Sequence, residues 1–352
     1  MMKRNCWCTM AVFFFIIGSV CFAQRVQAEE NMTTKFTVNP ILPKNQVAAT
    51  QSYYDLIVTN GQTQKLELAL INKTNEELTV DLAIANATTN VNGLIVYNDL
   101  KTKPDRSMEN PLTSLIYLPN KQVKIPAKQT VLAQMFMEIP SKGLKGVVLG
   151  GIYATLASEK EEARTVTGLT SRYGFNVAIT LRSSEKVPMY LAETLQLTTV
   201  VPKIERGSKT VQAVIQNPTA AIFPEVSLEG QITKKGESKK IAKRVLSIVR
   251  FAPNTVMNFN IDLGKKNLQP GTYVFEGTAR LKADENQGWH FKREFKITNQ
   301  QAKALNKEAS IKLVLPKWWI PTFYGLLAIT VIAIILAIKM SFNQYLLLKQ
   351  LD

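Results

Sequence analysis

The sequence predicts an all-β protein of tandem immunoglobulin-like β-sandwiches followed by a single C-terminal transmembrane helix. Three observations support this fold class. Short runs of alternating apolar and polar residues recur roughly every ten residues between Lys35 and Thr298, separated by turn residues. Helical periodicity is almost absent from the same stretch. A long uncharged apolar run follows near the C-terminus, as is typical of a membrane-spanning helix.

Residues 1–28 have the pattern of a secretory signal peptide. Lys3 and Arg4 precede an apolar run from 10 to 23, and small residues lead to a predicted cleavage site after Ala28. The alternatives are cleavage at another position and retention as an N-terminal anchor, although the run is short for a membrane span. All three cysteines lie in this segment, so the mature chain is predicted to have neither a disulfide nor a thiolate metal site.

Residues 31–158 are predicted to form the first sandwich. Its strands alternate clearly, as in the sequence VLAQMFMEI from Val131 to Ile139. An insertion from Asn86 to Asn120 is rich in Asn, Asp, Thr and Pro and lacks periodicity, so we expect a long surface loop that can display binding residues. The polar stretch from Ser158 to Arg172 is predicted to separate this sandwich from the next.

Residues 172–300 are predicted to form the second sandwich, because the two halves repeat the same order of parts. In each half a glycine leads a strand that ends in an Asn-x-Thr turn, from Asn72 to Thr74 in the first and from Asn217 to Thr219 in the second. A turn that contains proline then introduces a later strand in both halves. Chance similarity between β-rich segments is the alternative to two related modules.

The C-terminal part is divided into three segments. Residues 301–317 are basic and Ala-rich and are predicted to form a stalk. Residues 318–338 carry no charge and, at about 1.5 Å per residue, would make a helix roughly 31 Å long, enough to span a bilayer. Residues 339–352 are the predicted cytoplasmic tail. With a signal peptide at the other end, residues 29–317 are expected outside the cell membrane, facing the cell wall.

The chain is basic, with a formal net charge of +16. A nucleic-acid binder would place base-stacking aromatic residues among clustered cations, and this pattern is missing, so no nucleic-acid partner is predicted. The densest cluster consists of Lys234, Lys235, Lys239, Lys240, Lys243 and Arg244. Such a cluster either protects the edge strand of a solvated hairpin, or attracts anionic wall polymers such as teichoic acids, or an acidic protein.

The sequence predicts no enzyme chemistry and no cofactor. His290 is the only histidine, so a catalytic triad has at most one candidate and a His-rich metal site has none. Ser183 and Lys186 match a Ser-x-x-Lys pattern, but the companion motifs of penicillin-binding enzymes are missing. A hydrolase of the cell wall is still a possible function, because it would need a pair of carboxylates in a cleft, and sequence alone cannot locate such a pair.

Several motifs in order resemble the WxL-interacting protein family. They are PILPKNQ from Pro40, YYDL from Tyr53, GVVLGGI from Gly146, LQPGTY from Leu268 and WHFK from Trp289. Each motif alone is weak, whereas their order and spacing over almost the whole mature chain are specific. That family pairs an N-terminal peptidoglycan-binding domain with a C-terminal host-binding domain, followed by a membrane helix.

The resemblance implies a non-catalytic surface scaffold of a Gram-positive-type bacterium. Such a protein binds peptidoglycan, helps to display WxL-type surface proteins and contacts host matrix proteins. The chain has no Trp-x-Leu tripeptide of its own, as expected of the partner of a WxL protein. The alternative function is a membrane-anchored chaperone or assembly factor for exported cell-wall proteins.

The candidate ligand-binding residues are Asn45, Gln46 and Tyr54, together with the 86–120 insertion. The peptidoglycan-binding domain of the family falls in this half of the chain. Amide groups beside an aromatic face also suit the hydroxyls and rings of sugars. In the alternative interpretation, Asn45 and Gln46 satisfy backbone groups at a turn while Tyr54 packs in the core.

Overall fold

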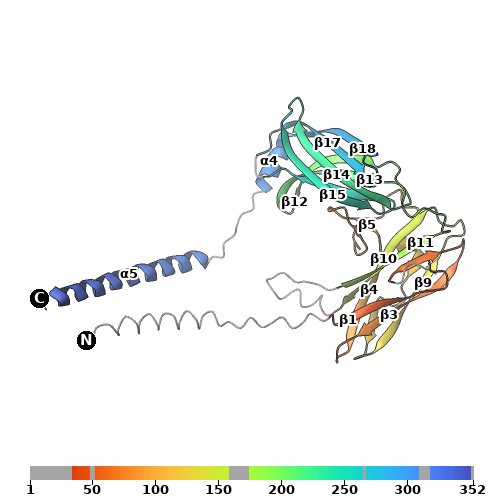
Figure 1. Ribbon diagram of the computed structural model, residues 1–352, viewed down its shortest axis with the longest axis horizontal. Helices are drawn as coiled ribbons and strands as arrows, with labels where there is room; N and C mark the ends of the chain where they lie inside the picture. Colours follow the sequence, from red (N-terminus) through yellow and green to blue (C-terminus); the bar gives the residue numbers. More distant parts are fainter. Residues whose placement is uncertain (1–33, 48–51, 158–173, 265–266, 309–317, 350–352) are drawn as a thin grey trace.

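The computed structural model describes residues 34–47, 52–157, 174–264, 267–308 and 318–349. They form two β-rich bodies and a long helix that stands apart from both (Figure 1). The fold is mostly β, as predicted. The predicted signal peptide lies outside the described residues.

The first body consists of two sheets that face each other across an apolar core. One sheet has the strand order β1 (Phe36–Ile41), β3 (Thr63–Asn72), β9 (Thr130–Glu138) and β7 (Ile116–Tyr117). The other has the order β2 (Tyr54–Ile57), β11 (Gly174–Arg182), β10 (Val147–Leu156), β4 (Leu78–Asn86) and β8 (Gln122–Ile125). Neighbouring strands are antiparallel except β2 and β11, which are parallel.

Burial alternates along these strands as the sequence pattern requires. In β9 the side chains of Ala133, Met135 and Met137 are buried, whereas those between them are exposed. The buried set packs against residues of the other sheet, such as Ile152 and Ile179, in one core cluster. Period-two patterning therefore gives each strand a core face and an outer face.

Strand β11 belongs to the first body, which differs from the predicted boundary at 158–172. Its residues pair with β10 from Val147↔Arg182 to Thr155↔Gly174, so the two strands form a hairpin of one sheet. The polar stretch between them, residues 158–173, lies outside the described residues. A hairpin loop and a domain linker have the same polar composition, and composition therefore could not separate the two.

The second body is also a two-sheet sandwich. Its smaller sheet has the order β12 (Gln196–Glu205), β13 (Ser208–Asn217) and β16 (Thr255–Asp262). Its larger sheet has the order β15 (Lys240–Phe251), β14 (Phe223–Lys234), β17 (Gly271–Leu281) and β18 (Gly288–Ile297). Four fully buried aromatic side chains fill the space between the sheets: Phe223, Phe251, Phe259 and Phe275.

Helix α4 (Asn299–Glu308) packs on the second sandwich, although its sequence was predicted to begin a stalk. Ala302 and Leu305 are buried in the second core. The side chain of Asn306 also accepts a hydrogen bond from the amide of Leu268 and donates one to its carbonyl, both at 2.9 Å. Only these two apolar side chains of the helix are buried in the core, and in so basic a segment they were too weak a signal to predict a helix packed on the sandwich. Residues 309–317 lie outside the described residues.

Helix α5 (Trp319–Lys349) contains the predicted transmembrane segment and is longer than the predicted 318–338. Its apolar part, Trp319–Met340, is 22 residues long and contains an 18-residue stretch with a mean hydropathy of 2.3, none of which is buried against the rest of the protein. By length and composition it can cross a membrane, because about 20 apolar helical residues match the hydrocarbon thickness. The helix continues into the predicted cytoplasmic tail.

The two sandwiches share a turn that supports the predicted repeat. Asn72 and Asn217 are buried at the ends of equivalent strands, β3 and β13. The Asn72 amide donates to the carbonyls of Glu76 and Ile125, at 2.7 and 3.0 Å, while its oxygen accepts from the amide and hydroxyl of Thr74. In both turns the asparagine side chain donates to the carbonyl four residues ahead of it. It also donates to a second carbonyl, which lies in the segment that leads into β9 in the first body and into β16 in the second.

The second turn reproduces these contacts. Asn217 donates to the carbonyls of Ala221 and Ala252, at 2.9 and 3.0 Å, and accepts from the amide and hydroxyl of Thr219. The later turn has a non-glycine residue at positive φ in both bodies, Lys128 at 58° and Asn254 at 52°. This agreement in side-chain detail favours related modules over chance similarity.

We expect the substitution Asn217→Ala to lower the free energy of unfolding by about 2–4 kcal/mol. It leaves the buried carbonyl of Ala221 without its donor, and an unsatisfied buried polar group costs about 1–3 kcal/mol. It also removes the hydrogen bonds of Asn217 to Ala252, whose carbonyl keeps the Thr255 hydroxyl as a donor, and to Thr219. Urea unfolding of the ectodomain measures the change. The exposed Asn258 in the same sandwich is the matched control, where alanine should cost less than about 0.5 kcal/mol. Equal losses at the two positions would contradict the prediction.

Candidate binding surfaces

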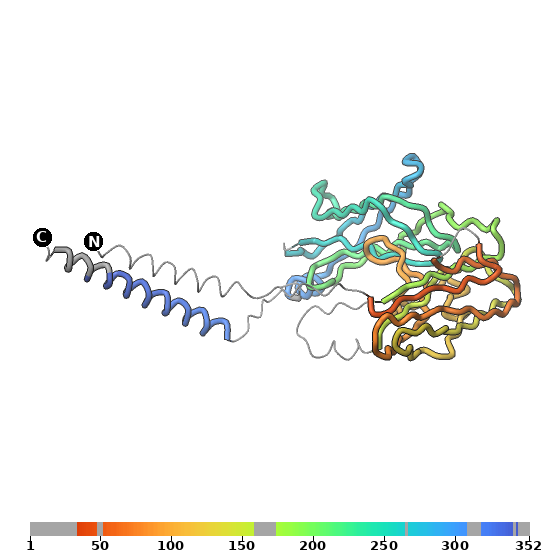
Figure 2. The backbone as a smooth tube through the Cα atoms, turned by 60° about the horizontal axis from the view of Figure 1, so that its bottom comes forward, coloured from red at the N-terminus to blue at the C-terminus, as the bar shows by residue number. Residues whose placement is uncertain are grey.

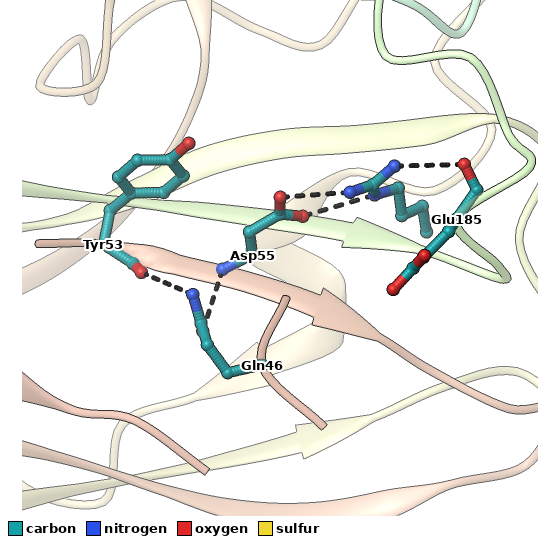
Figure 3. Close-up of polar contacts among 5 residues, drawn as sticks. Gln46, Tyr53, Asp55 and Glu185 are labelled. Atoms are coloured by element: carbon teal, nitrogen blue, oxygen red, sulfur yellow. Dashed lines mark hydrogen bonds and ion pairs between the residues drawn. The ribbon is translucent and has the colours of Figure 1, made fainter. Parts of the chain in front are cut away.

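Asn45 and Gln46 lie in the turn that precedes β2 and bond mainly to neighbouring backbone. Asn45 donates to the carbonyl of Ile57 at 2.8 Å. Gln46 donates to the carbonyl of Tyr53 at 3.2 Å and accepts from the amide of Asp55 at 3.1 Å (Figure 3). Both side chains are half-buried. Their amides thus hold the turn against the start of the strand.

Tyr54 is fully buried in the first core. Its hydroxyl donates to the carbonyl of Glu67 at 2.5 Å, and burial raises the pKa of this phenol well above its usual range. A ring in this position has no face open to a ligand. The contacts of Asn45, Gln46 and Tyr54 are those of the alternative interpretation, in which the amides satisfy backbone groups and the tyrosine packs in the core.

An ion pair that the sequence analysis missed lies next to this turn. The carboxylate of Asp55 accepts two hydrogen bonds from the guanidinium of Arg182, at 3.3 and 3.2 Å, and Arg182 also donates to the carbonyl of Glu185 (Figure 3). Asp55 is 3% exposed and Arg182 9% exposed. Each is a lone charge in an apolar run, YYDLIV and VAITLR, which is the signal that could have indicated a buried pair.

The first part of the 86–120 insertion is an arm that joins the two sandwiches and is not a free surface loop. This interdomain arm, residues 87–97, contains β5 (Thr88–Thr89) and β6 (Ile95–Val96) and reaches the second sandwich (Figure 2). The hydroxyl of Thr89 is buried against that of Thr255, 3.0 Å away, and accepts from the amide of Ala252 at 2.9 Å. The expectation of a displayed loop was wrong for these residues.

An apolar cluster and further hydrogen bonds complete the joint between the sandwiches. Ala87 and Leu149 of the first body pack against Ile222 and Ala252 of the second. The amide of Val147 donates to the carbonyl of Ala220 at 2.6 Å. Gly93 has φ 77° and its carbonyl accepts from the amide of Arg250, while a Cβ there would lie 2.7 Å from the side chain of Val249. Only glycine fits this close approach.

Asp105, later in the insertion, makes a polar contact across the joint. Its carboxylate accepts a hydrogen bond from Gln216 at 2.7 Å. Burial alone would raise the pKa of Asp105, but hydrogen bonds from Ser107, Gln216 and a backbone amide outweigh burial and lower it. The carboxylate is therefore ionised at neutral pH, and the stability that these hydrogen bonds add to its ionised form is lost as the pH falls through the lowered pKa.

The predicted basic cluster lies on the hairpin between β14 and β15 and along β15. Three of its lysines pair with glutamates: Lys234 with Glu237, Lys235 with Glu294 and Lys243 with Glu229. Lys239 and Lys240 are exposed at the turn. Because β15 is the edge strand of its sheet, these lysines are placed where they discourage pairing with another chain.

Arg244 of the cluster has a different role. It points inward from the edge strand, lies over the ring of Phe259 at 5.3 Å, and donates to the carbonyl of Val91 in the interdomain arm at 2.9 Å. Burial lowers its pKa. An inward-pointing charge on an edge strand is a known protection against aggregation, and here it also fastens the arm.

The outer face of the sheet β1-β3-β9-β7 exposes two aromatic rings side by side. Tyr117 and Phe136 are register partners on β7 and β9, and Phe136 is the partner of Lys65 on β3. Tyr117 is 65% exposed and Phe136 45%. An open depression of about 640 Å³ lies beside the rings. Its lining is mixed: Thr63, Gln64, Thr113, Ser114 and Glu138 are polar, and Leu115, Ile116 and Met137 are apolar.

His290, the only histidine, is exposed on the outer face of the second sandwich. Its Nδ1 lies 3.3 Å from the hydroxyl of Thr278. Within the residues that the structure describes, no three His, Cys, Asp or Glu side chains come together as they would around a metal ion.

Comparison with known proteins shows the family. The model of the WxL Interacting Protein peptidoglycan binding domain matches residues 36–155, and that of the WxL Interacting Protein host binding domain matches residues 164–307. Together the matches cover well over half of the chain. The chain belongs to the WxL Interacting Protein family. Both domains occur in the predicted order, so the resemblance inferred from the motifs is confirmed.

The family boundaries and the sheet boundaries differ at one strand of this WxL Interacting Protein. The match to the host binding domain begins at residue 164, ahead of β11, whereas β11 is hydrogen-bonded into the sheet of the first sandwich. The match extends to residue 307 and so includes helix α4, in agreement with the burial of Ala302 and Leu305.

Solved structures give only distant likenesses. A chaperone–tip adhesin complex of CFA/I fimbriae is 10% identical, with 73% of this chain and 97% of that chain covered at a TM-score of 0.28. The YadV chaperone is 11% identical (74% and 100%, TM-score 0.26), and the E. coli chaperone DraB is 12% identical (68% and 91%, TM-score 0.22). These scores are too low to support an argument about this chain. No curated protein matches.

Proposed function

We propose that this WxL Interacting Protein is a non-catalytic, membrane-anchored scaffold of the bacterial surface whose first sandwich binds peptidoglycan. The observation that carries the proposal is the match of the peptidoglycan binding domain to residues 36–155, which is most of the first sandwich. The second sandwich, matched by the host binding domain, is the proposed site for WxL-type surface proteins and for host matrix proteins. The interdomain arm would hold the two binding bodies together.

The proposed orientation places both sandwiches outside the cell membrane and the C-terminal end of α5 inside. The apolar helix supports a membrane anchor, and the predicted signal peptide supports export of the part that precedes it. In this orientation the sandwiches face the cell wall. The proposed function as a wall-binding scaffold needs that placement.

The basic cluster provides a second attraction to the wall, through its charge and not through a shaped glycan site. Lys239 and Lys240 are exposed, and the whole chain carries a formal charge of +16. Anionic wall polymers would be attracted to such a surface, with a dependence on salt that is characteristic of exposed charges. Binding through charge and binding through a shaped glycan site can therefore be separated experimentally.

We expect a fragment of residues 31–187 to sediment with purified cell walls and a fragment of 188–308 to do so much less. The cut follows β11, so that the first sandwich keeps all of its strands. Sedimentation is measured with whole walls and with peptidoglycan freed of anionic polymers, and circular dichroism checks that each fragment is β-rich. Binding by 31–187 should persist at 0.5 M salt, where the screening length is only about 4 Å.

Equal sedimentation of both fragments that vanishes as salt is raised would assign wall binding to the excess positive charge. A pull-down then distinguishes the scaffold from the alternative function as a chaperone or assembly factor. A scaffold should retain a WxL protein selectively, whereas a general chaperone would retain unrelated exported proteins equally well.

A further inference from the structure

The outer face of the sheet β1-β3-β9-β7 exposes the rings of Tyr117 and Phe136, which do not pack in the core. The two rings point away from the core, whose side of β9 is occupied by Ala133, Met135 and Met137. Burying an aromatic side chain is favourable, so two neighbouring exposed rings on a short edge strand and its partner require an explanation. Tyr117 stands at the sheet edge, where no further strand covers it.

We propose that this face, the aromatic row, holds the glycan strand of peptidoglycan, with Tyr117 and Phe136 as its stacking platform. The inference rests on the proposed function of the first sandwich and assigns that function to particular residues. Aromatic rings offer a flat apolar face to the C–H side of a sugar ring, and these two rings leave the same face of the sheet from register partners on adjacent strands.

The depression beside the rings supplies groups that match the polar rim of a sugar. Thr63, Thr113 and Ser114 line it with hydroxyls, which can both donate and accept hydrogen bonds, as sugar hydroxyls do. The Ser114 hydroxyl already donates to the carbonyl of Pro111, and that of Thr113 accepts from Asn86, so these two offer a sugar their remaining capacity: Ser114 as an acceptor and Thr113 as a donor. A flat apolar interface for another protein would not need such a hydroxyl-lined hollow next to the rings.

Asn45 holds Gln64 behind this face. The side-chain oxygen of Asn45 accepts a hydrogen bond from Gln64 at 2.9 Å, and Gln64 accepts one from Gln62 at 2.7 Å. Gln64 is in phase with the buried Leu66 and pairs with the buried Met137, so it lies on the core side of β3 and not on its outer face. Gln64 lines the depression. These hydrogen bonds between side-chain amides fix the orientation of Gln64. The amide nitrogen of Asn45 donates to the backbone carbonyl of Ile57, which holds Asn45 in the turn.

The charges on the aromatic row favour an uncharged glycan over an anionic polymer. Lys65, beside Phe136, is paired with Glu67 at 2.9 Å, and Glu138 adds a negative charge at the depression. The basic cluster of the chain lies on the other sandwich. An anionic polymer would meet no excess of positive charge on this face.

The test uses the detergent-solubilised full chain and peptidoglycan freed of anionic polymers. We expect Tyr117→Ala/Phe136→Ala to weaken sedimentation about 30-fold, as for the loss of two stacking contacts of about 1 kcal/mol each. Tyr117→Phe/Phe136→Tyr keeps both rings and should bind like the original chain. Val245→Ala/Ile248→Ala removes two comparably exposed apolar side chains from the second sandwich and is the matched control, with no expected change.

Each result has a distinct meaning. Loss of binding in the alanine pair alone, with unchanged circular dichroism, supports the inference. If the original chain binds and the alanine pair binds equally well, the aromatic row is not the glycan site, and the proposed function stands. If the original chain does not bind, the proposed function and this inference both fall. If the alanine pair instead changes the oligomeric state of the protein without ligand, the face is an interface between copies of the chain and the inference is overturned.

Discussion

Deleting residues 318–352 is expected to move the protein from the membrane fraction to the culture medium. The deleted part contains the one helix, among the described residues, that is long and apolar enough to cross a bilayer, with a mean hydropathy of 2.3 over an 18-residue stretch between Trp319 and Met340. Such a helix inserts in an effectively irreversible way, so its loss should change the distribution almost completely. Because none of it is buried against the sandwiches, the truncated protein should keep its fold.

The matched control is a deletion of residues 341–352, which leaves the apolar part intact and should stay with the membrane. Immunoblots of washed membranes and of medium measure the distribution. A truncated protein that remains with membranes after a high-salt wash would show that the anchor lies elsewhere. Retention of the apolar segment of residues 1–28 would be the first explanation to examine.

The strands of both sandwiches could be predicted because alternation is a local property. In β9 the three buried positions alternate and are all apolar, although the apolar Leu132 and Phe136 beside them are exposed. The repeat of Asn72 and Asn217 was also visible, since an Asn-x-Thr turn is coded within three residues. The turn itself could not predict the distant partners of these asparagines. Asn72 donates to the carbonyl of Ile125 and Asn217 to that of Ala252, and both carbonyls lie far along the chain.

Pairing between strands accounts for the differences from the sequence analysis. The place of β11 in the first sandwich depends on its hydrogen bonds to β10 and to the distant β2, which its own residues do not specify. The interdomain arm has strands of only two residues, so it carries no periodicity, and Thr89 meets Thr255 across a separation of 166 residues. Its polar composition suits a loop and a joint equally.

The candidate residues Asn45, Gln46 and Tyr54 lie in the part of the chain that the peptidoglycan binding domain matches. Asn45 hydrogen-bonds to Gln64 of the depression, whereas Tyr54 is a core residue. Alternation could have shown this, because Tyr54 is in phase with the buried Leu56. It could also have found Phe136, which shares a face with exposed Gln134 and Glu138. Tyr117 could not be found, because it lies in a two-residue strand within an irregular segment.

Arg182→Met is expected to lower the free energy of unfolding by about 3–5 kcal/mol, out of the 5–15 kcal/mol typical of a domain. Asp55 and Arg182 are both buried, and the pair is bonded at two points. Removing the guanidinium leaves a carboxylate in the sheet without its partner, and the cost of an uncompensated buried charge is larger than the net value of the pair. Asp55→Leu should have a similar effect.

The double substitution Asp55→Leu/Arg182→Met distinguishes a buried pair from two independent packing residues. It removes both charges and fills the site with apolar groups, so most of the lost stability should return. Urea unfolding of the ectodomain gives the four free energies of this double-mutant cycle, and the expected coupling is at least about 2 kcal/mol. If the losses of the single substitutions simply add in the double variant, the two side chains are not coupled, and β2 is held to β11 by its backbone hydrogen bonds and core contacts instead.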